Sequence, residues 1–120
     1  MDLAFDHQWR ALLQELSSTY GEDLDLNSIL FLIGVQELGQ DIRSYEKREK
    51  LELMHIAVCT LLEPFGYYSA QGRDKEGWPH FKKNMGLPSL NAEEQERLMK
   101  EAMITYFEED GYRGMSMTVS

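Results

Sequence analysis

Residues 27–38, NSILFLIGVQEL, form the most apolar part of the chain and decide how the other segments must pack. Helical spacing continues through VQEL and no other segment offers a partner strand, so we predict a helix over 28–38. Asn27 or Ser28 can cap its start, and Gly39 can end it. Its apolar side chains point in nearly every direction, which predicts a central helix surrounded by others. They are Ile29, Leu30, Phe31, Leu32, Ile33, Val35 and Leu38.

Two longer segments on either side of this stretch are amphipathic. The apolar residues of 3–20 recur at helical spacing on one stripe, and Gly21 follows as a natural helix end. A similar stripe predicts a helix over 45–63, which Pro64 stops because it lacks a backbone N–H. We expect the inward-facing residues to be Phe5, Trp9, Leu12, Leu13, Leu16 and Tyr20 in the first helix and Leu51, Met54, His55, Val58, Leu61, Leu62 and Phe65 along the second.

A fourth helix is predicted over 92–109. Asn91 and Glu94 have the spacing of a capping box, in which each side chain satisfies a free backbone donor of the first turn. Four helices of this kind predict an all-α fold, a compact bundle, and the length of 120 residues suits one domain. We assign that domain to residues 1–111 and expect an irregular tail over 112–120.

The connection between the third and fourth helices is unusually long and rich in aromatic residues. The segment 65–81 holds Phe65, Tyr67, Tyr68, Trp78 and Phe81. The stretch GRDKEG is typical of a polar turn. Pro79 at a first helical position and Gly86 past the end predict a short extra helix near 79–85. We expect Trp78 and Phe81 to face inward as a lid over the bundle, which leaves Asp74 and His80 as the chemically suggestive groups of this connection.

The charge distribution narrows the class of partner. The net charge is −9, and both ends of the chain are acidic while residues 27–90 are balanced. Nucleic-acid binding and peripheral membrane binding require basic surfaces, so we expect neither. An acidic surface favours a basic protein partner. With a single cysteine, no signal-peptide pattern and no apolar run long enough to cross a bilayer, we expect a cytoplasmic protein.

One constellation on the third predicted helix suggests a metal site. Glu52, His55 and Cys59 lie on neighbouring faces, and Glu-x-x-His is half of the motif of di-iron bundles. The second half is missing, so any site would need a loop ligand such as His80 or Asp74. The competing interpretation is a core histidine beside a small buried cysteine, whose apolar surroundings would leave the thiol unreactive.

These observations favour a binding protein over an enzyme. We predict a protein-interaction or regulatory module that uses the aromatic 65–81 connection or the acidic helix faces, with no cofactor and no catalytic residue assigned. The alternative is a metal-binding protein that uses His55 with Glu52, Cys59 or His80, and a third possibility is acid–base chemistry by His80 and Asp74. The candidate binding residues are His55, Tyr67, Tyr68, Asp74, Trp78 and His80.

Overall fold

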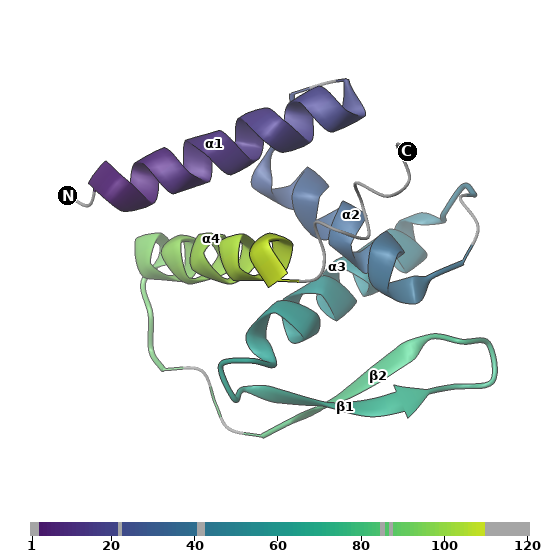
Figure 1. The fold of residues 1–120 in the computed structure, drawn as a ribbon. Coiled ribbons are helices and arrows are strands. Elements are labelled where there is room, and N and C mark those ends of the chain that lie inside the picture. Colours follow the sequence, from purple (N-terminus) through teal and green to yellow (C-terminus); the bar gives the residue numbers. More distant parts are fainter. Residues whose placement is uncertain (1–2, 22, 41–42, 85, 87, 110–120) are drawn as a thin grey trace.

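The chain folds into four helices and one β-hairpin (Figure 1). The computed structural model describes residues 3–21, 23–40, 43–84, 86 and 88–109, and the tail predicted for 112–120 lies outside them. The elements are α1 (Leu3–Tyr20), α2 (Leu26–Leu38), α3 (Lys47–Leu62), β1 (Tyr68–Arg73), β2 (Pro79–Lys83) and α4 (Ala92–Glu109). The prediction of four main helices is confirmed. The all-α assignment is wrong, because β1 and β2 pair as an antiparallel hairpin.

The helix ends follow from their capping groups. At the start of α4, Asn91 Oδ1 accepts a hydrogen bond from the N–H of Glu94 at 2.8 Å, and the Asn91 N–H donates to Glu94 Oε1 at 3.0 Å. The predicted capping box is therefore present. Helix α2 begins at Leu26, two residues earlier than predicted. Its N-cap is Asp25, whose Oδ1 accepts a hydrogen bond from the N–H of Ser28 at 2.8 Å.

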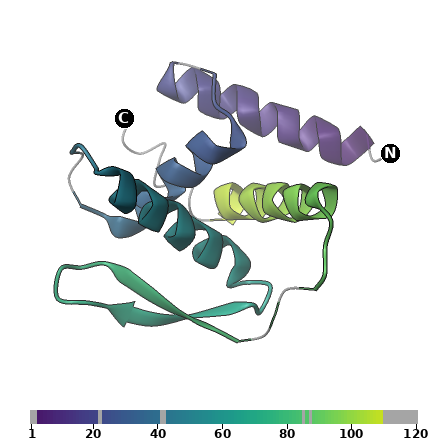
Figure 2. The same ribbon diagram turned by 180° about the vertical axis from the view of Figure 1, so that it is seen from behind.

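A single large cluster of buried side chains joins the four helices. Helices α1 and α4 lie side by side, and α3 contacts α2, α4 and the hairpin, as views from two sides show (Figures 1 and 2). Ile29 and Ile33 of α2 are fully buried, whereas Phe31, Leu32 and Val35 are only half-buried, so α2 is not covered on every side as expected. The buried members of the cluster are Trp9, Leu16, Ile29, Leu30, Ile33, Ala57, Leu61, Leu62, Ala102, Met103 and Phe107.

Helices α2 and α3 are in close contact at Gly34. A Cβ atom placed on Gly34 would lie 2.7 Å from the carbonyl carbon of Leu53 and 2.9 Å from its Cβ. Cβ atoms in proteins essentially never lie this close to another heavy atom. The backbone of Leu53 also cannot move aside as a flexible side chain can, because the interior is closely packed. Gly34 therefore sets how closely the two helices pack.

The inward stripe predicted for the third helix is only partly right. Leu51 is 61% exposed, and His55 is also exposed, whereas Leu53 and Ile56 are buried. The reason is that α3 packs on more than one side, against α2, α4 and the hairpin. A helix covered on two sides has no single apolar stripe, so its periodicity does not identify one inward face.

The short helix predicted near 79–85 is wrong, because this segment contains strand β2. A tight turn brings the chain back on itself: the Asp74 N–H donates to the Trp78 carbonyl, and the Gly77 N–H donates to the Asp74 carbonyl, both at 3.0 Å. Gly77 has φ 88°, the left-handed conformation that a three-residue hairpin loop of this kind needs. Pro79 is tolerated because it is the first residue of a strand in a sheet of only two strands.

A bulge in β1 turns Arg73 toward the helices. Ala70 pairs with Phe81 and Arg73 pairs with Pro79, so two residues of β1, Gln71 and Gly72, oppose His80 alone. Without the extra residue, Arg73 would point to the opposite face of the hairpin. With it, Arg73 shares a face with Pro79 and Phe81, which are half-buried on the side of α3.

Arg73 and Trp78 fasten the hairpin to the helices. The Arg73 guanidinium donates to the carbonyls of Glu37 at 2.6 Å and Leu38 at 2.9 Å, which are free acceptors at the end of α2. Trp78 packs against a second buried cluster of Leu38, Tyr45 and Leu53. The predicted inward role of Trp78 is therefore found, on a hairpin rather than on a helix.

Candidate functional site

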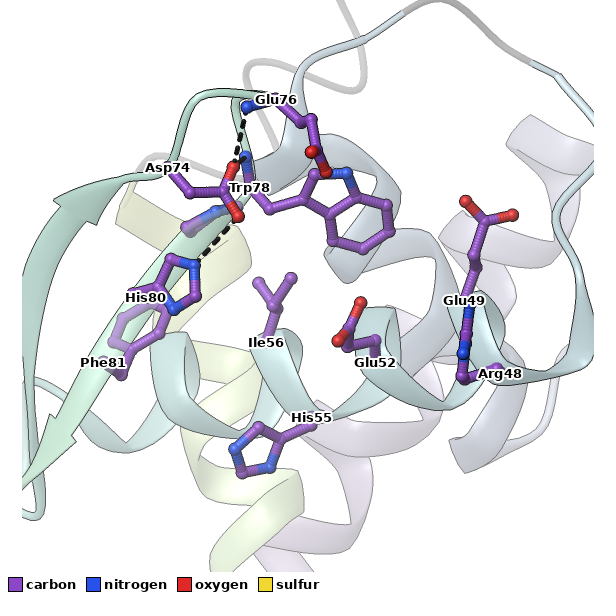
Figure 3. Close-up of a pocket in the computed structure, with 11 residues that line it drawn as sticks. Arg48, Glu49, Glu52, His55, Ile56, Asp74, Glu76, Trp78, His80 and Phe81 are labelled. Atoms are coloured by element: carbon purple, nitrogen blue, oxygen red, sulfur yellow. Dashed lines mark hydrogen bonds and ion pairs between the residues drawn. The ribbon is translucent and has the colours of Figure 1, made fainter.

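The most suggestive site is a groove between α3 and the hairpin, with a volume of about 480 Å³. Helix α3 contributes Arg48, Glu49, Glu52, His55 and Ile56, and the turn and β2 contribute Asp74, Glu76, Trp78, Pro79, His80 and Phe81. We call this the α3–hairpin groove (Figure 3). Four of the six candidate binding residues, His55, Asp74, Trp78 and His80, line it.

The other two candidates, Tyr67 and Tyr68, do not line the groove. Both are half-buried and pack against the main core cluster. Tyr67 and Tyr68 therefore help to attach the start of the hairpin to the helices. Their place in the structure gives no support to the predicted role as binding residues.

Asp74 organises the hairpin turn. Its Oδ1 accepts hydrogen bonds from the N–H groups of Glu76 at 3.0 Å and Trp78 at 2.9 Å, and its Oδ2 lies 3.0 Å from Nε2 of His80. The hydrogen bond from His80, followed by that from the Trp78 N–H, lowers the pKa of the Asp74 carboxyl. Asp74 is thus held as a carboxylate, and its oxygens are occupied by groups of its own turn.

The side chains of His55 and His80 do not point toward each other. The side chain of His80 is 61% exposed and faces Asp74. In Figure 3, Glu52 and Ile56 point from α3 toward the hairpin, whereas His55 points away from the Asp74–His80 pair. The nearest polar partner of His55 is Cys59, whose Sγ lies 3.6 Å from its Nε2.

The residues proposed as metal ligands are not assembled into a cluster. Among the described residues, no group of three or more His, Cys, Asp or Glu side chains is placed to hold a metal ion. Cys59 is fully buried, and burial raises the pKa of its thiol to about 11. The interpretation of Cys59 as a small buried side chain agrees with this, whereas the interpretation of His55 as a core histidine is wrong because His55 is exposed.

The charged groups of the groove are mostly acidic, and two carboxylates and one guanidinium have no partner among the described residues. Glu49 is bound by Arg43 at 3.0 Å, and Asp74 by its own turn. Within the part of the chain that the structure describes, the carboxylates of Glu52 and Glu76 have no hydrogen bond or ion pair, and neither does the guanidinium of Arg48. The groove therefore presents two free carboxylates and one free cation to solvent.

An aromatic side chain lines the same groove as these two carboxylates. In the view of Figure 3, the indole of Trp78 lies between Glu76 on the turn and Glu52 on α3. Trp78 is half-buried, since it packs against the second buried cluster and also lines the groove. Ring surface flanked by negative charge attracts a cation that stacks on the ring.

Sequence reasoning named His55 and Glu52 of α3 as candidates but missed Arg48 and Ile56 of the same helix. Arg48, Glu52 and Ile56 are spaced four residues apart and so lie on one stripe of the helix. That spacing could have been read from the sequence. It was obscured because the predicted inward face of the helix was a different one.

Comparisons with protein-family models, with curated proteins and with solved structures found no match to this chain. None of the helices in the described ranges is long and apolar enough to span a bilayer. The chemistry of the α3–hairpin groove is therefore the basis for the function proposed below.

Proposed function

We propose that the chain is a protein-interaction module that binds a basic segment of a partner protein in the α3–hairpin groove. The observation that carries this proposal is that two carboxylates, Glu52 and Glu76, have no partner among the described residues and line the same groove as the half-buried ring of Trp78. Large aromatic side chains at the centre of a patch with a polar rim are typical of protein interfaces.

The overall charge supports a basic partner. The chain carries a net charge of −9, so its field attracts positively charged segments before contact and speeds association at low ionic strength. The single cysteine fits a reducing compartment such as the cytoplasm, which is part of this proposal.

The Asp74–His80 pair gives less support to an enzyme. A carboxylate that orients a histidine is part of many acid–base sites, and the separation of 3.0 Å is suitable. However, among the described residues that line the groove there is no Ser, Thr, Cys or Lys to act as a nucleophile. The pair has a structural role already, because it holds the turn that carries Glu76 and Trp78.

Affinity capture from native cells tests the proposal. Wild-type protein is compared with a groove variant, Glu52→Gln with Glu76→Gln, and with a matched control, Glu93→Gln with Glu108→Gln, which removes two exposed charges of α4. We expect a partner with a Lys/Arg-rich segment to be enriched by the wild type and the control, and about fivefold less by the groove variant. Equal recovery by all three proteins, or recovery of the bait alone at low salt, would contradict the proposal.

A further inference from the structure

We propose that the α3–hairpin groove binds one arginine side chain, whose guanidinium stacks on Trp78 and pairs with the carboxylates of Glu52 and Glu76. This inference rests on the proposed function and specifies the chemistry of the bound group. It is carried by three observations: the indole is partly covered, the two carboxylates have no partner within the described ranges, and the nearby cation Arg48 does not pair with them.

The indole is held in place before any ligand arrives. The ring of Trp78 packs against the buried cluster of Leu38, Tyr45 and Leu53, and the backbone N–H of Trp78 donates to Asp74 Oδ1 at 2.9 Å. Gln40 fixes the neighbouring hairpin turn, because its Nε2 donates to the Glu76 carbonyl at 2.8 Å. A preorganised ring loses little conformational entropy when a ligand stacks on it.

The two carboxylates favour arginine over lysine. The guanidinium is planar, stacks on aromatic rings and presents five N–H donors, so one side chain can stack and donate to more than one carboxylate. The same chemistry occurs within this chain, where the Arg43 guanidinium lies 4.3 Å from the centre of the Tyr45 ring and also pairs with Glu49. The groove volume of about 480 Å³ lies in the range of ligand-binding pockets.

A substitution of Arg48 should have the opposite effect on binding to a substitution of the two carboxylates. Arg48 lies one helical turn before Glu52 and lines the same groove, so its positive charge competes with a cationic ligand for the carboxylates. Removing that charge strengthens the binding of a cation. If the groove instead bound an anion through Arg48, His55 and His80, the same substitution would weaken binding.

An NMR titration with defined peptides tests the inference. The probes are the acetylated peptide amide Gly-Gly-Arg-Gly-Gly and its counterpart with neutral citrulline in place of arginine, added to ¹⁵N-labelled protein. We expect the arginine peptide to shift the Trp78 indole N–H signal and to bind about fivefold more tightly than the citrulline peptide. Glu52→Gln with Glu76→Gln should weaken binding about fivefold, and Arg48→Gln should strengthen it about twofold.

The controls separate this inference from the proposed function. Glu93→Gln with Glu108→Gln should leave the peptide affinity unchanged, and amide spectra show that each variant is folded. Equal affinity for the arginine and citrulline peptides, or weaker binding by Arg48→Gln, would overturn the inference. If the groove variant still loses its partner in affinity capture while the peptides do not differ, the groove binds a protein by other contacts, and only the arginine assignment fails.

Discussion

The guanidinium of Arg73 on β1 donates a 2.6 Å hydrogen bond to the carbonyl oxygen of Glu37 at the end of α2. Two further bonds, to the carbonyls of Leu38 at 2.9 Å and Gly77 at 2.8 Å, complete this contact. Arg73 thus joins the end of a helix to the hairpin turn, with its positive charge at the negative end of the helix dipole. The α3–hairpin groove depends on this junction because the hairpin forms one of its walls.

Replacing Arg73 by Met should therefore loosen the hairpin. We expect the free energy of unfolding to fall by about 1–3 kcal/mol, because three carbonyls lose a charged donor. Hydrogen exchange of the β1 and β2 amides should also become faster. Lys82→Met is the control, since Lys82 is exposed on the other face of β2. Equal urea unfolding curves for the two variants would show that Arg73 does not hold the hairpin.

A second prediction concerns the close packing of α2 on α3. Gly34→Ala places a methyl group against the backbone of Leu53, and we expect a loss of about 2–4 kcal/mol in stability. Gly86→Ala is the matched control, because nothing lies within 4 Å of an added Cβ there, and it should change stability by less than about 0.5 kcal/mol. Thermal unfolding of both variants measures the difference. A Gly34→Ala protein as stable as the control would mean that the two helices are farther apart than described.

A third prediction concerns the titration of Asp74. Its pKa is lowered chiefly by the hydrogen bond from His80. The stabilisation that this carboxylate gives to the turn is therefore complete above the pKa of the unfolded chain, about 3.9, and is lost as the pH falls through the lower pKa of the folded state. Carboxyl ¹³C NMR should show the pKa of Asp74 rising toward its usual value in His80→Ala. In the control His7→Ala it should not move, and an unchanged pKa in His80→Ala would refute the pairing.

A fourth prediction concerns the contact between α2 and α4. Glu37 is half-buried, and its Oε2 accepts a 2.6 Å hydrogen bond from the hydroxyl of Tyr106. Tyr106→Phe should cost about 1–2 kcal/mol of stability, and a double-mutant cycle with Glu37→Gln should give a coupling of about 1 kcal/mol. Tyr20→Phe, at an exposed position of α1, is the control. Additive effects of the two substitutions in urea unfolding would rule out a direct bond.

The helices could be predicted from the sequence because their signals are local. The bounds 3–20 and 92–109 are those of α1 and α4, and the latter start was fixed by the capping box of Asn91 and Glu94. The helical state of α2 was predicted from the helical spacing that continues through VQEL. Neither result required knowledge of distant contacts.

The hairpin was mispredicted because its determinants are a turn and a tertiary contact. Pro79 and Gly86 suit the two ends of a short helix, but they also fit a strand that starts at a proline. Gly77 at the end of the DKEG turn was the local signal for a hairpin, and the bulge that aims Arg73 at α2 has meaning only in the folded chain. Prediction from the sequence can use a local signal such as Gly77, but it cannot detect a contact that forms only in the folded chain.

Only part of the candidate site could be predicted, because some of its residues can be recognised by their type and others only by their place in the fold. Asp74, Trp78 and His80 stood out because of their residue types, and they do line one groove. Glu76 and Arg48 did not stand out, because exposed charged residues are common and only the fold places them beside Trp78. Tyr67 and Tyr68 also stood out by residue type but pack against the core cluster, since large aromatic side chains are common in cores as well as in interfaces.

The most direct measurement is the affinity of the captured partner for the wild type, for Glu52→Gln with Glu76→Gln, and for the control Glu93→Gln with Glu108→Gln, by titration calorimetry at low and high salt. We expect the groove variant to bind about tenfold more weakly than the other two proteins at low salt, because two unscreened charges at the interface are lost. High salt should reduce this difference. Equal affinities of the three proteins at low salt would contradict the account.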